Sequence, residues 1–99
     1  MSAFSDHLRL TILRALAHAP QYTANSSIIH TVCGEVGLSA TRDQVKTEIA
    51  WLAEQGLLTR KLLAEDMGGL IVATLSERGL DVADGRAVQP GVQRPAPGA

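Results

Sequence analysis

The spacing of hydrophobic positions predicts three amphipathic helices in the first half of the chain. The first covers residues 6–18 with Ser5 as its cap, and its apolar stripe consists of Leu8, Ile12, Leu13 and Leu16. A second helix, capped by Asn25 or Ser26 and ended by Gly37, carries Ile28, Ile29, Val32, Cys33 and Val36. The residues between them, 21–25, are expected to form a connector.

The stretch 41–58, TRDQVKTEIAWLAEQGLL, predicts the third helix, which has the clearest start and stop signals of the three. Val45, Ile49 and Leu52 recur on one face at i, i+4 and i+7. Thr41 followed by Gln44 is the sequence of a capping box, and Gly56 supplies a left-handed stop. Only three residues separate this helix from the one before it, which is the signature of a helix-turn-helix.

Two apolar runs follow, LLTRKLLA and LIVATL, joined by the glycine-containing turn AEDMGG. They are expected to pair as a two-stranded wing. Ser76 can cap a short last helix over residues 77–84. The predicted fold is therefore mainly α with a small β-hairpin, a winged helix-turn-helix over residues 1–84. Residues 85–99, which are rich in proline and glycine, form an extended tail.

Composition narrows the functional classes. Ninety-nine residues make one domain. A net charge of -1 gives no global attraction to nucleic acid, so any DNA contact has to come from a local basic patch. The single cysteine, Cys33, excludes an intramolecular disulfide and fits a reducing cytosol. Because no apolar run of about 18 residues occurs, we expect a soluble cytoplasmic protein without a membrane span.

The architecture favours DNA recognition by the start of the third helix. In the major groove Arg42 suits guanine and Gln44 suits adenine, while Lys46 and Thr47 suit phosphates. Arg60 and Lys61 at the base of the wing add two cations. Against this interpretation stand four carboxylates: Asp43 and Glu48 in the helix, and Glu65 and Asp66 at the expected tip of the wing.

The alternative is a surface that binds another protein. Trp51 lies at the rim of the apolar face of the third helix, where it either covers the wing strands or stays exposed as an anchor for a partner. Val88 and Val92 can hold the tail against the domain or against a neighbouring subunit. Such an adaptor needs no DNA.

Metal binding and catalysis find little support. His30 and Cys33 are three residues apart on one predicted helix, but no third or fourth ligand is evident. The MGGL sequence lacks the spacing and the lysine of a P-loop. We therefore expect no cofactor, no metal and no enzymatic activity.

Two resemblances follow from these residues. VKTEIAWLAEQGLLTR, a glycine turn and VATLSERGLDVA are similar to the recognition helix, wing and last-helix entry of arsenic-repressor and multiple-antibiotic-resistance regulators. The segments FSDHLRLTILRALAHAP, TANSS, RDQVKTEIAWLAEQGL, VATLSERGLDVADGRA and PGVQRPAPG also resemble a family of small proteins of Mu-like prophages, whose genes tend to lie near those for packaging and lysis. This chain lacks the cysteine pair of the metal-sensing regulators.

The resemblances imply a DNA-binding phage or prophage transcriptional regulator, acting on double-stranded DNA as a homodimer. The alternative they leave open is a winged-helix adaptor for another phage protein in assembly or packaging.

Overall fold

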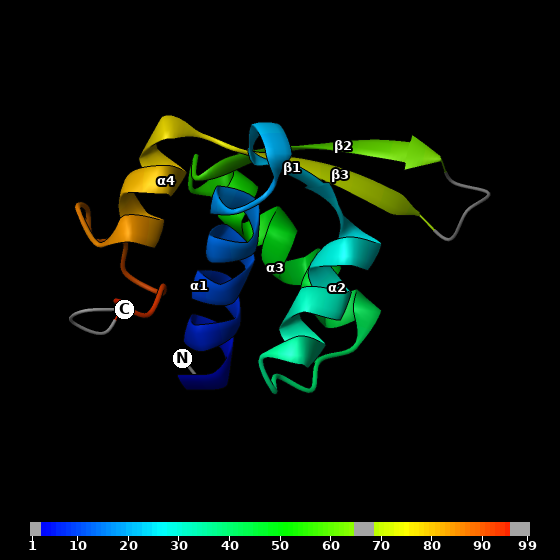
Figure 1. Cartoon of the computed structure of the whole chain (residues 1–99), viewed down its shortest axis with the longest axis horizontal. Coiled ribbons are helices and arrows are strands. Elements are labelled where there is room, and N and C mark those ends of the chain that lie inside the picture. The colour runs from blue at the N-terminus through cyan, green and yellow to red at the C-terminus, as the bar shows by residue number, and fades with distance from the viewer. Residues whose placement is uncertain (1–2, 65–68, 96–99) are drawn as a thin grey trace.

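The computed structural model describes residues 3–64 and 69–95, and it confirms a mainly α fold with a small sheet (Figure 1). The elements follow in the order α1 (Ala3–Ala17), the 3-10 turn η1 (Pro20–Tyr22), β1 (Thr23–Asn25), α2 (Ser26–Glu35), α3 (Arg42–Glu54), β2 (Leu58–Ala64), β3 (Leu70–Leu75) and α4 (Glu77–Asp84). The sheet runs across the top of the three helices in Figure 1, and the β2–β3 hairpin projects beyond α2.

The sheet has three strands where the sequence predicted two. Its order is β1-β3-β2 and both pairings are antiparallel, with Thr23 opposite Thr74 and Leu58 opposite Leu75. The expected connector over residues 21–25 was therefore wrong in its second part, because those residues pair along the free edge of β3. A strand between the first two helices completes the arrangement typical of a winged helix.

The helices begin and end where local side chains cap them or a glycine stops them. The Thr41 hydroxyl accepts from the Gln44 amide at 3.0 Å, and the Gln44 side chain accepts from the Thr41 amide at 2.7 Å. Gly56 ends the segment with a φ of 77°. Asn25 caps α2 and Ser76 caps α4. Ser5, however, lies inside α1 and does not cap it, because α1 extends back to Ala3.

The core lies where α1, α2 and α3 meet the inner face of the sheet. Fully buried leucines, isoleucines and valines from all three helices pack against Ala73 of β3, and α4 flanks α1 on the side away from α2 (Figure 1). The predicted inner residues Val45, Ile49 and Leu52 are all buried, so one face of α3 is fixed toward this core.

Residues 85–95 fold back onto the helices. The amide of Gln93 donates to the carbonyl oxygen of Asp6 at the start of α1, at 3.1 Å. Val92 is only 7% exposed and belongs to the core cluster, whereas Val88 is 55% exposed. Of the two valines predicted to anchor the tail, Val92 does so on the domain itself.

Candidate nucleic-acid interface

The outer face of α3 is set by the burial of its inner face. At about 100° per residue, the positions opposite Val45, Ile49 and Leu52 are Asp43, Thr47, Ala50 and Glu54. Asp43, Thr47 and Glu54 are exposed. The ridge that a recognition helix would insert into a groove therefore carries Thr47 between two carboxylates, and the predicted cations lie on its flank.

Arg42 and Lys46 both lie on the flank that faces α2 and the wing. The Arg42 guanidinium donates to the Ser27 hydroxyl in the first turn of α2, at 3.3 Å. A Cβ placed on Gly69, just before β3, would lie 3.4 Å from the Lys46 ammonium nitrogen. The two cations thus border the place where α3, the start of α2 and the start of β3 meet.

The N-terminus of α2 contributes to the same place. Ser26 accepts the amide of Ile71 at 3.1 Å, which ties α2 to β3, and Asn25 accepts the amide of Ile28. The positive end of the α2 dipole therefore points toward the region that Arg42 borders. Backbone amides and a guanidinium in this arrangement suit a phosphate group.

Gln44 has a structural task in addition to any role in recognition. Its side-chain oxygen accepts the Thr41 amide in the capping box, so the amide NH2 group alone remains available to a ligand. The two-point contact with adenine needs both the oxygen and the nitrogen of the side chain. A base contact by Gln44 would therefore compete with the cap of α3.

Glu48 is withdrawn from the recognition surface by a buried ion pair. Its carboxylate accepts from Arg9 Nε at 2.8 Å, and the two side chains are 12% and 10% exposed. A negative charge that the sequence placed among the recognition residues is thus neutralised inside the molecule. Asp43 remains as the exposed carboxylate closest in sequence to Arg42.

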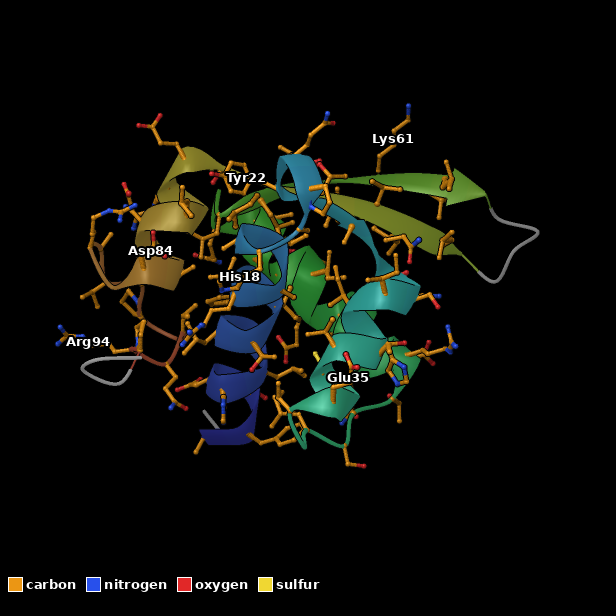
Figure 2. The ribbon with its side chains drawn as sticks, viewed as in Figure 1. His18, Tyr22, Glu35, Lys61, Asp84 and Arg94 are labelled. Atoms are coloured by element: carbon orange, nitrogen blue, oxygen red, sulfur yellow. The ribbon has the colours of Figure 1, made fainter. Side chains whose placement is uncertain are left out.

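Arg60 and Lys61 project from opposite faces of the sheet. Arg60 lies opposite Ala73, which is buried in the core, so its side chain is on the face toward the helices. Lys61 lies opposite Val72 and points away from the helices (Figure 2). Only Arg60 can join Arg42 and Lys46 on one surface. Glu65 and Asp66 lie outside the described residues.

Trp51 is half-buried and does not stand out as an exposed anchor. The Arg9 guanidinium carbon lies 3.9 Å from the centre of the Trp51 ring, a cation–π distance. Arg9 Nη1 also donates to the Gly91 carbonyl oxygen at 2.9 Å. The tail covers Trp51 so closely that a Cβ on Gly91 would lie 2.8 Å from Trp51 Cη2.

Arg9 is the residue that the sequence reasoning missed. It joins α1 to Glu48 and Trp51 of α3 and to Gly91 of the tail. A signal was present, because Arg9 falls in line with Leu13 and Leu16, at i+4 and i+7, on the apolar stripe of α1. A charged residue at such a position predicts a buried partner, although the spacing alone does not identify it.

His30 and Cys33 gain no third possible metal ligand within the described residues. Among the described residues no group of three histidine, cysteine, aspartate or glutamate side chains has the spacing of a metal site. His30 Nε2 is 2.9 Å from the Ala40 carbonyl oxygen, and Cys33 is buried. Burial raises the pKa of the Cys33 thiol to about 11, which leaves it protonated and unreactive at neutral pH.

Comparison with known proteins places the chain among phage proteins. It is 45% identical over 93 residues to the uncharacterized protein gp26 of Escherichia phage Mu, covering 94% of this chain and 92% of gp26. The chain belongs to the family of phage Mu gp26. An uncharacterized Haemophilus influenzae protein is 43% identical over 72 residues, covering 73% of this chain and 67% of that relative.

The comparisons with family models and with solved structures give no further similarity for this chain. No protein-family model matches the chain, and no solved structure matches it. Within the described residues, no helix is long and apolar enough to cross a membrane.

Proposed function

We propose that this member of the gp26 family binds double-stranded DNA through α3 and the helix-facing side of its wing. The observation that supports it is the convergence of Arg42, Lys46 and the N-terminus of α2 beside an outer face of α3 that stays exposed. Arg60 extends this set along the wing. Transcriptional regulation in a phage or prophage is the role that such binding would serve.

The internal pairing of Glu48 supports the same proposal. With Glu48 held by Arg9, the cations Arg42, Lys46 and Arg60 lie near the outer face of α3 together with the exposed carboxylates of Asp43 and Glu54. Near-neutral balance of this kind predicts modest affinity that depends on a few phosphate contacts. Three cations correspond to a slope of roughly -2 to -3 in log affinity against log salt.

The first test is a titration of the purified protein with random and prophage-derived duplexes at low and near-physiological salt. Fluorescence anisotropy should show binding at low salt that weakens with about this slope. Asp43→Asn should strengthen binding by roughly two- to fivefold, because it removes a negative charge near the phosphates. Glu77→Gln, the same change of charge in α4, serves as the matched control and should leave the affinity within about twofold.

An adaptor that binds through Trp51 and the tail is less well supported. Trp51 is already in contact with Arg9 and Gly91 of the same chain. Val92 is packed into the core. Val88 is the one of the three that stays exposed.

A further inference from the structure

A groove between α1 and α2 lies outside the proposed DNA interface. It has a volume of about 560 Å³, and its apolar lining includes Leu10 and Ala15 of α1, Ile28, Ile29 and Val32 of α2, and Val36 directly after α2. Ile28 and Val36 are 53% and 59% exposed and line the same groove, so they form part of one exposed apolar surface. An apolar surface of this shape is suited to bind a ligand.

The ionisable side chains along the groove are all basic. His7, Arg14 and His18 recur at i, i+7 and i+11, so they form one stripe along α1 and the residue after it, at the rim of the groove. Figure 2 labels His18 at the C-terminal end of α1. No aspartate or glutamate of the described chain lines it.

Arg14 gives the clearest indication of what the groove accepts. It is partly buried, yet its guanidinium makes no hydrogen bond or ion pair in the parts of the chain that the structure covers. A partly buried guanidinium is stabilised by a carboxylate, and this chain does not place one there.

The shape of the groove favours an extended ligand. Because Ile28 and Val36 stay more than half exposed, the groove is open along α2 and would leave a small molecule largely in water. The stripe from His7 to His18 runs for about 16 Å, roughly three helical turns. A second copy placed symmetrically on the same face would bring like charges together, which disfavours a self-pairing.

We propose that the α1–α2 groove binds an acidic amphipathic helix of another protein. Its apolar residues would pack on Ile28, Val32 and Val36, and a flanking carboxylate would pair with Arg14. This is the helix-in-groove mode of recognition, in which apolar anchors repeat at helical spacing. The proposal is independent of DNA binding, since the groove shares no residue with Arg42, Lys46 or Arg60.

The test uses two labelled 18-residue model helices with the same leucine stripe, one flanked by glutamate and the other by lysine. Fluorescence anisotropy with the full chain should show saturable binding of the glutamate peptide. Arg14→Glu should weaken that binding by roughly tenfold and improve binding of the lysine peptide. Ile28→Ser should weaken both, while Leu62→Ser, the loss of an exposed leucine on the wing, should change neither.

Three results would overturn the proposal. The first is no binding of the glutamate peptide, or equal binding of both peptides to the wild-type chain. The second is saturable binding of decanoate in the groove without binding of the peptide, which would indicate a small apolar acid as the ligand. The third is a dimer in sedimentation that Ile28→Ser converts to a monomer, which would assign the groove to a second copy.

Discussion

Arg9 places a buried positive charge against Glu48, Trp51 and Gly91, so the stability of the domain should depend on it. Replacing it by alanine leaves the Glu48 carboxylate without this partner at a site where both side chains are about nine-tenths buried. Breaking one half of such a pair costs about 3 kcal/mol or more. We expect Arg9→Ala to lower the free energy of unfolding by about this amount in urea titrations.

Arg14 offers the matched control for this experiment. It is the same residue type on the same helix, but no ion pair ties it to the described part of the chain. Arg14→Ala should therefore cost less than about 1 kcal/mol. Equal losses for the two alanine variants would show that the Arg9 contacts contribute no special stability.

Two helix caps were predictable from the sequence. Thr41 with Gln44, and Ser76 before α4, could be read from sequence because a cap is made by residues three apart. The partners of Arg9 could not, since Glu48 and Gly91 are distant in sequence. The separation of Arg60 from Lys61 depends on the register of β2 against β3.

At the scale of elements, the C-terminal segment is a packed part of the fold and not a free extension. Gly91 has a φ of 92° and lies against Trp51, so Gly91→Ala introduces both backbone strain and a clash. We expect the segment to leave Trp51. Since Trp51 is the single tryptophan, its fluorescence emission should shift to longer wavelength.

Gly37→Ala separates these two effects. Gly37 has a similar φ of 87°, but a Cβ there would meet no atom within 4 Å. The Gly37→Ala variant should lose about 1 kcal/mol of unfolding free energy through backbone strain, while the emission of Trp51 stays unchanged. An unshifted spectrum in Gly91→Ala would mean that the tail does not cover the ring in solution.

β1 shows why one element escaped prediction. Three residues, Thr23–Asn25, carry too little hydrophobic alternation to indicate a strand, and their conformation is set by pairing with β3. The α1–α2 groove escaped for a similar reason. Ile28 and Val36 have the sequence pattern of inner positions, yet the fold leaves both of them exposed.

At the scale of the whole molecule, the two proposed surfaces lie on different parts of the fold. The basic set of Arg42, Lys46 and Arg60 borders α3 and the wing, and the α1–α2 groove uses the outer sides of α1 and α2. The two proposed ligands would therefore occupy separate sites. The homodimer expected from the resemblance stays a prediction, which sedimentation can check.

The sheet provides the most direct test of the central claim, that DNA lies along α3 and the helix-facing side of the wing. Arg60→Glu and Lys61→Glu make the same change of charge at neighbouring positions on opposite faces of β2. At low salt, duplex binding should weaken by roughly tenfold or more in Arg60→Glu and by less than about threefold in Lys61→Glu. Equal losses in the two variants, or no duplex binding by the wild-type chain, would contradict the proposed interface.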